Sequence, residues 1–153
     1  MMFSSRVRII ALASLLPLSA HAGAWGEGAF DNDAAQDLLA ECTRSADPAV
    51  VSQALELALV ASFVDADDGA AAVAAAELIA DALGRSGAAP RTRVVPCLAT
   101  TPRDQLRALA PRAVRAVERV AEPAVSELAQ QWAEEKPNRW SIGLRQLAAR
   151  LRR

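Results

Sequence analysis

The apolar residues of this 153-residue chain recur at the spacing of α-helices, and a large share of them is alanine. Hydrophobic residues make up 52% of the chain, whereas aromatic residues make up only 4%. Alanine has the highest intrinsic preference for helix, while strands favour β-branched and aromatic residues. The chain is therefore predicted to be all-α, a compact bundle of five to six short helices with no convincing strand.

The first residues have the pattern of a cleavable secretory signal peptide. Arg6 and Arg8 supply the positive start, and residues 9–16 form a short apolar run. Ala20 and Ala22 then place small residues at the two positions that a signal peptidase reads. The apolar run is shorter than the roughly twenty residues of a membrane span, so a removable signal is the better interpretation.

The expected cleavage site lies between Ala22 and Gly23. Residues 1–22 are then the signal peptide, and residues 23–153 form a single helical domain. No second long apolar stretch follows, so we expect no integral membrane segment after cleavage. The domain is expected in the periplasm or secreted outside the cell, and the sequence does not decide between the two.

Residue counts of the mature chain disfavour several functions. Without Arg6 and Arg8, 15 basic and 18 acidic residues remain, a net charge of −3 that argues against nucleic acid as a partner. The single histidine, His21, lies in the signal peptide, so the mature chain lacks the imidazole base of serine and cysteine hydrolases. Most zinc sites need histidine or several cysteines, so neither a metal nor a cofactor is expected.

Cys42 and Cys97 are the only cysteines. In an oxidising compartment, a single pair of cysteines most simply forms one disulfide. Cys42 also shares an apolar helix face with Ala35 and Leu38, so two buried free thiols are the alternative. The expected compartment favours the disulfide.

Local signals predict where the helices begin and end. The glycine-rich segment 23–30 is expected to be irregular and anchored by Trp25 and Phe30. Helices are then expected over about 33–44, 48–63 and 65–83, with a long loop at 85–100, followed by helices that start near Thr101, Pro123 and Asn138. At the first helix, Asp31, Asn32 and Asp33 are N-cap candidates, and Asp33 and Gln36 have the spacing of a capping box. Gly84 is predicted to be a C-terminal cap. Pro111 should kink or break its helix.

Two acidic segments resemble binding sites at first sight. Residues 65–69 read DADDG, but a calcium loop needs glycine at its sixth position, and from Asp65 the glycine is fifth. Helix capping is therefore the expected role of these acids. Asp31 and Asp33 also stand at a helix start, and with Trp25 and Phe30 beside them they are candidates for a small pocket.

Several segments together point to a family. The stretch from Gly23 to Asp33 reads GAWGEGAFDND, and weaker matches are Ala75-Ala76-Glu77-Leu78, Ser126-Glu127-Leu128 with Trp132, and Trp140 with Leu147 and Leu151. The chain resembles an uncharacterised bacterial family called domain of unknown function 4259. The likeness spans nearly the whole mature chain, and it implies the extent of the domain, because the family has no established activity to carry over.

The resemblance also suggests a role for the new amino terminus. Typical family members look cytoplasmic and begin with Met directly before the GAWG segment, so loss of Met there and cleavage after Ala22 here would both expose Gly23. One hypothesis is that the free amino group of Gly23 pairs with an acid, for which Glu77 is a candidate. The alternative is that Gly23 frays, as termini usually do, and that Glu77 is a solvated edge residue.

Arg103, Arg107, Arg115 and Arg119 share one helical stripe. This stripe is either a contact face for an acidic protein or anionic lipid headgroups, or a solvated face with local ion pairs. For function, we expect a non-enzymatic module that binds another protein, of the inhibitor or immunity type. The alternative is a small carboxylate-dependent hydrolase acting on envelope polymers, because carboxylates are the general bases that remain.

Overall fold

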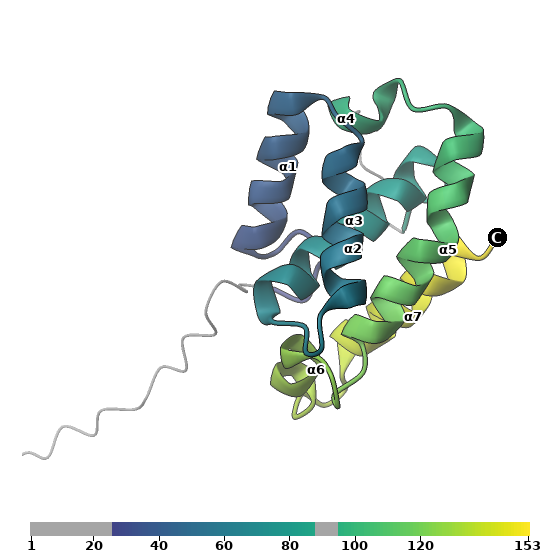
Figure 1. Cartoon of the computed structure of the whole chain (residues 1–153). Coiled ribbons are helices and arrows are strands. Elements are labelled where there is room, and N and C mark those ends of the chain that lie inside the picture. Colours follow the sequence, from purple (N-terminus) through teal and green to yellow (C-terminus); the bar gives the residue numbers. More distant parts are fainter. Residues whose placement is uncertain (1–25, 88–94) are drawn as a thin grey trace, which may run out of the picture.

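The computed structural model describes residues 26–87 and 95–153, and within them the protein is all-α, as predicted (Figure 1). These ranges contain no strand, although Val64 and Ser126 form one isolated parallel bridge. In chain order the helices are α1 (Asp33–Ser45), α2 (Ala49–Val60), α3 (Ala66–Ala82), α4 (Pro96–Ala99), α5 (Arg103–Val120), α6 (Glu127–Trp132) and α7 (Arg139–Leu151).

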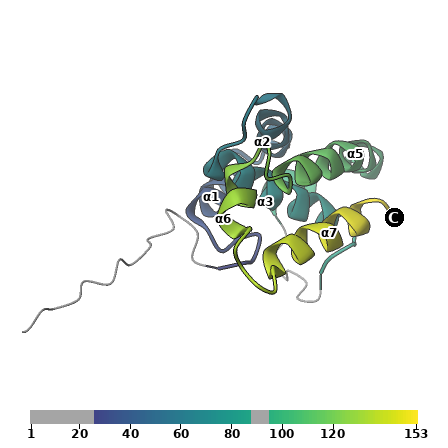
Figure 2. The ribbon, with the colours of Figure 1, turned by 90° about the horizontal axis from the view of Figure 1, so that it is seen from below.

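Helix α3 lies at the centre of the bundle. The views in Figures 1 and 2 show α1, α2, α5 and α7 arranged around it, and each of the four contacts it. Small side chains make this possible, because they let several helix axes approach α3 closely. The buried alanines of α3 are Ala70, Ala72, Ala74, Ala75, Ala76 and Ala80. At Gly69 a Cβ atom would lie 3.1 Å from Cδ1 of Leu128, so glycine gives α6 room to pack there.

Four helices begin with a side-chain cap. The capping side chain in each case accepts a hydrogen bond from the backbone N–H three residues later, and the four caps are Asn32, Asp65, Ser126 and Asn138. The predicted capping box of Asp33 and Gln36 is wrong, because Asn32 is the cap. The side-chain amide of Gln36 instead donates to the carbonyl oxygen of Phe30 at 2.7 Å.

The end of α3 has the predicted glycine cap. Gly84 adopts φ 74°, a left-handed conformation that glycine reaches without a steric penalty. Its N–H donates to the carbonyl of Asp81 at 2.9 Å, and the N–H of Arg85 donates to the carbonyl of Ala80 at 2.8 Å. Both hydrogen bonds belong to the Schellman motif, which satisfies the last carbonyl groups of the helix.

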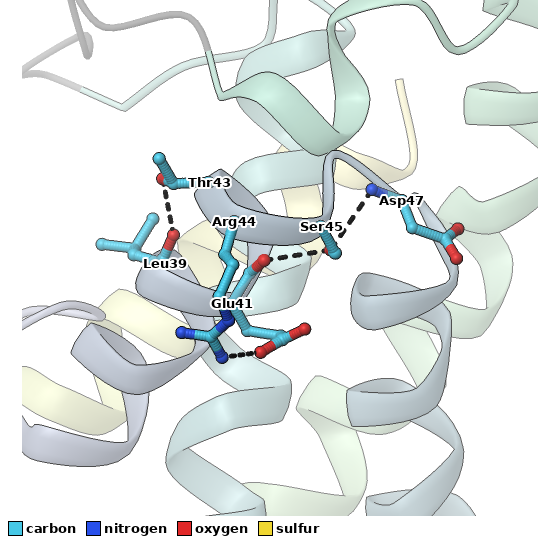
Figure 3. A network of polar contacts seen from close by, with 6 residues as sticks. All are labelled: Leu39, Glu41, Thr43, Arg44, Ser45 and Asp47. Carbon is cyan, nitrogen blue, oxygen red and sulfur yellow. Dashed lines mark hydrogen bonds and ion pairs between the residues drawn. The ribbon is translucent and has the colours of Figure 1, made fainter.

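The short connection from α1 to α2 is held by local polar contacts (Figure 3). The hydroxyl of Ser45 donates to the carbonyl of Glu41 at 3.0 Å and accepts from the N–H of Asp47 at 3.3 Å. The carboxylate of Asp47 then accepts from the N–H of Ala49 at 2.8 Å, which starts α2. This connection turns the chain so that α2 packs beside α1.

Cys42 of α1 and Cys97 of α4 form the predicted disulfide, with their Cα atoms 5.0 Å apart. Both cysteines are fully buried. The long loop predicted at 85–100 is partly wrong, because residues 96–99 form the one-turn helix α4. Pro96 is the first residue of this helix. Proline is favoured at this position because a backbone N–H there would have no acceptor within the helix.

Of the kink or break predicted at Pro111, the break is wrong, because α5 continues through this residue. Pro111 is exposed, and the carbonyl that it leaves without an intrahelical partner belongs to the exposed residue Arg107. Water can therefore satisfy that carbonyl. Packing of α5 against α2, α3 and α7 offsets the remaining cost.

Candidate functional site

Residues 26–31 form a loop folded around the side chain of Asp31. Its Oδ2 atom accepts a hydrogen bond from the N–H of Gly28 at 3.0 Å, and its own N–H donates to the carbonyl of Gly28 at 3.0 Å. A Cβ atom on Gly26 or on Gly28 would lie only 2.5 Å from Oδ2 of Asp31. The close approach of this carboxylate therefore requires glycine at both positions.

This loop is one wall of a groove of about 530 Å³, which we call the N-terminal groove. Helices α3 and α7 form the other walls, so that three segments far apart in the sequence meet there. Its larger lining side chains are Glu27, Phe30, Asp31, Val73, Glu77, Asp81, Trp140, Leu144, Gln146, Leu147 and Arg150. The lining thus combines a largely apolar wall from α7 with carboxylates from the loop and α3.

Glu77 and Arg150 form a two-pronged ion pair at this groove. The guanidinium atoms Nη1 and Nη2 of Arg150 donate to Oε1 and Oε2 of Glu77 at 2.8 and 2.7 Å. Only 16% of each side chain is exposed. Arg150 also donates to the carbonyl of Arg85 at 3.0 Å, and the guanidinium of Arg85 donates to the carbonyl of Leu151 at 2.8 Å. These charge-assisted bonds join the end of α3 to the end of α7.

The structure brings together three members of the predicted binding cluster. Phe30, Asp31 and Glu77 all line the N-terminal groove. Asp33 does not line it, since it is the exposed first residue of α1. Trp25, the remaining member, lies outside the described residues.

The predicted cleavage site at Ala22 and Gly23 also lies outside the described residues, so the hypothesis about the Gly23 amino group stays a prediction. Glu77 itself is no solvated edge residue. Both of its carboxylate oxygens accept hydrogen bonds from Arg150.

The acids at residues 65–68 serve the start of α3. Oδ1 of Asp65 accepts from the N–H of Asp68 at 2.8 Å, which confirms the predicted capping role. Burial raises the pKa of the Asp68 carboxyl above its usual value, and the neighbouring charges of Asp65 and Asp67 raise it further. In the described ranges, no three His, Cys, Asp or Glu side chains are grouped so that they could hold a metal ion.

The four arginines of the predicted stripe divide into two pairs. Arg103 donates to the carbonyl of Leu83 at 3.2 Å, and Arg119 donates to the carbonyls of Ala58, at 3.0 Å, and Ala61. These two arginines therefore satisfy carbonyl groups at the ends of α3 and α2. Arg107 and Arg115 make no such contact. They line a second groove, which lies between α5 and the end of α7.

Helix α2 exposes large apolar side chains on the face that also carries Gln53 and Glu56. Leu57 is 51% exposed and Val60 is 67% exposed, and their i, i+3 spacing places them on the same face of the helix. Phe63, just after the helix, is 46% exposed. We call Leu57, Val60 and Phe63 the α2 patch.

The sequence did not reveal the partner of Glu77. Arg150 stands in the last turn of its helix, where a positive charge already complements the helix dipole. Nothing local shows that this side chain faces a glutamate 73 residues earlier. The same holds for Arg103 and Arg119, whose acceptors are backbone carbonyl groups of other helices.

The fold and the sites define a small all-helical domain with one buried disulfide. A family model described as "Domain of unknown function (DUF4259)" matches residues 23–141, so the chain belongs to this family and the resemblance is confirmed. No curated protein and no solved structure matches the chain. No helix in the described ranges combines the length and the apolar character needed to cross a membrane.

Proposed function

We propose that the chain is exported through a cleavable signal peptide and that its domain binds another protein without catalysing a reaction. Two observations support export. The family match begins at residue 23, directly after the expected cleavage site. The disulfide between Cys42 and Cys97 is of the kind that persists in oxidising compartments.

The α2 patch is the observation that carries the binding proposal. Helix α2 turns Leu57 and Val60 toward solvent beside the polar residues Gln53 and Glu56, although burial of such large apolar side chains is favourable. Apolar side chains gathered at the surface mark contact sites for other proteins, whereas scattered single ones need no explanation. A partner that covers this face would remove the apolar surface from water, which is the main favourable term in protein association.

The alternative function, a carboxylate-dependent hydrolase, would need two carboxylates free to act across a cleft. Glu77 is poorly suited to this role, because both of its oxygens are engaged by Arg150. No observation favours this alternative over a binding module.

Capture from a periplasmic extract tests the binding proposal. The purified chain is immobilised, and the retained proteins are compared between the wild type and the variant with Leu57→Asp and Val60→Asp. We expect one or more proteins to be retained by the wild type and lost with this variant, because a charge buried at an apolar contact is strongly unfavourable.

Ile142→Asp is the matched control, since Ile142 is 39% exposed and lies on α7, away from α2. This variant should retain the same proteins as the wild type. Retention that is equal in all three proteins would contradict the proposal. Helical circular dichroism of each variant shows whether it is folded.

A further inference from the structure

A second groove lies between the middle of α5 and the end of α7, and it has a volume of about 680 Å³. Five arginines line it, contributed by the segment after α3, by α5 and by the residues after α7: Arg85, Arg107, Arg115, Arg152 and Arg153. No acidic residue is among its lining residues. We call it the arginine groove. It concentrates positive charge on a chain whose net charge is −1.

Three of the five guanidinium groups have no protein partner in the described ranges. Arg107, Arg115 and Arg153 are exposed, and their side chains make no hydrogen bond or ion pair with another described residue. Arg152 pairs with Glu118, and Arg85 donates to the carbonyl of Leu151. The groove therefore offers several unused cationic donors that converge on one space.

The floor of the groove is apolar. Ala110, Val114 and Leu151 are all at least nine-tenths buried, and Pro111 lies beside them. A ligand that fits both features carries negative groups at its edges and an apolar group between them. The volume of about 680 Å³ lies within the range of about 300–1,000 Å³ that is typical of ligand pockets.

We propose that the arginine groove binds an acidic segment of another protein, in which carboxylates flank an apolar side chain. This surface is separate from the α2 patch, and the inference rests on the proposed function only in that the partner is a protein. Arginine suits this role because its planar group donates two parallel hydrogen bonds to one carboxylate. A membrane surface with anionic headgroups is the alternative occupant, and the test below separates it from an acidic segment.

Direct binding of a synthetic peptide tests the proposal. The probe is a fluorescent peptide that alternates glutamate and leucine, and its polarisation is measured with the full exported chain at several salt concentrations. We expect binding that weakens as salt screens the charges. The double variant with Arg107→Gln and Arg115→Gln should bind the peptide at least about tenfold more weakly, because both arginines contact carboxylates of the ligand.

The matched control removes two positive charges elsewhere. Arg139 and Arg145 are exposed residues of α7 that line neither groove. The double variant with Arg139→Gln and Arg145→Gln should bind the peptide as the wild type does. A peptide with glutamine in place of glutamate should not bind. Equal weakening by both double variants would overturn the proposal, because it would show general charge attraction only.

Two further experiments test whether the arginine groove binds a membrane surface or a second copy of the chain instead. Vesicles of phosphatidylcholine with phosphatidylglycerol replace the peptide in one arm, and sedimentation of the chain alone detects a second copy in the other. Stronger binding to vesicles than to the peptide, or a dimer lost in the Arg107 and Arg115 variant, would overturn the proposal. Peptide binding that survives Leu57→Asp and Val60→Asp would show that the groove acts independently of the α2 patch.

Discussion

At the scale of single residues, arginine side chains donate most of the hydrogen bonds that join distant segments of the described domain. Arg150 holds both oxygens of Glu77, whereas Arg103 and Arg119 satisfy carbonyl groups at the ends of other helices. In each contact, the guanidinium group binds near the end of a neighbouring helix. Because the guanidinium group carries five donors in one plane, a single side chain can join two or three acceptors.

Loss of Arg150 should destabilise the fold more than loss of an exposed arginine. Arg150→Gln leaves the largely buried carboxylate of Glu77 without its partner, and we expect a loss of about 2 kcal/mol in the free energy of unfolding. Arg152→Gln removes an exposed ion pair with Glu118 and should cost less than ~0.5 kcal/mol. Urea unfolding followed by circular dichroism measures both changes.

The double variant with Glu77→Gln and Arg150→Gln completes a mutant cycle. It should be less destabilised than the sum of the two single variants, because it leaves neither charge unpaired. Additive effects in the cycle would show that the ion pair does not couple the two helices.

At the scale of helices, local sequence signals were enough to place most of the elements. Caps such as Asp65 and Gly84 act through neighbouring backbone groups, so their positions could be read from the sequence. The one-turn helix α4 and the unbroken helix α5 could not be predicted, because tertiary contacts stabilise them. In the candidate site, Phe30, Asp31 and Glu77 were found from the sequence. Arg107 and Arg115 of the arginine groove were also singled out from the sequence, as members of a stripe that could contact an acidic protein. Arg85, Arg150, Arg152 and Arg153 were not assigned to a groove, because segments distant in the sequence bring them there.

The unbroken course of α5 leads to a prediction about Pro111. Pro111→Ala restores an N–H that can bond to the carbonyl of Arg107, and alanine has a far higher helix propensity. Part of this gain is lost, because proline also restricts the unfolded chain. We expect a net stabilisation of about 1 kcal/mol or more, measured as a higher midpoint of urea unfolding.

Pro102 supplies the matched control for this substitution. It occupies the N-cap position of α5, where no intrahelical N–H bond is missing. Pro102→Ala should therefore bring no gain in stability. If Pro111→Ala also brings no gain in stability, the missing hydrogen bond to the carbonyl of Arg107 does not weaken α5, which contradicts this prediction.

At the scale of the whole molecule, an alanine-rich helix at the centre lets four others pack around it, and one disulfide ties α1 to α4. Such packing buries small side chains, so each contact contributes little hydrophobic free energy. We therefore expect the covalent link to contribute a considerable share of the stability. It also makes the stability of the domain dependent on the redox state of its surroundings.

Reduction of the disulfide should lower the free energy of unfolding by about 4 kcal/mol, because the bond restricts a loop of 55 residues in the unfolded chain. Urea unfolding with and without a thiol reductant measures this difference. The variant with Cys42→Ala and Cys97→Ala should unfold at the same urea concentration under both conditions. A wild-type midpoint unaffected by full reduction would contradict the stabilising role.

The central claim is that the protein is exported, cleaved and oxidised. The most direct test is the intact mass of the protein purified from the periplasmic fraction of bacteria that express the full chain. The account predicts the mass of residues 23–153 less two hydrogen atoms, for one disulfide. A mass that still includes residues 1–22, or free thiols at Cys42 and Cys97, would contradict it.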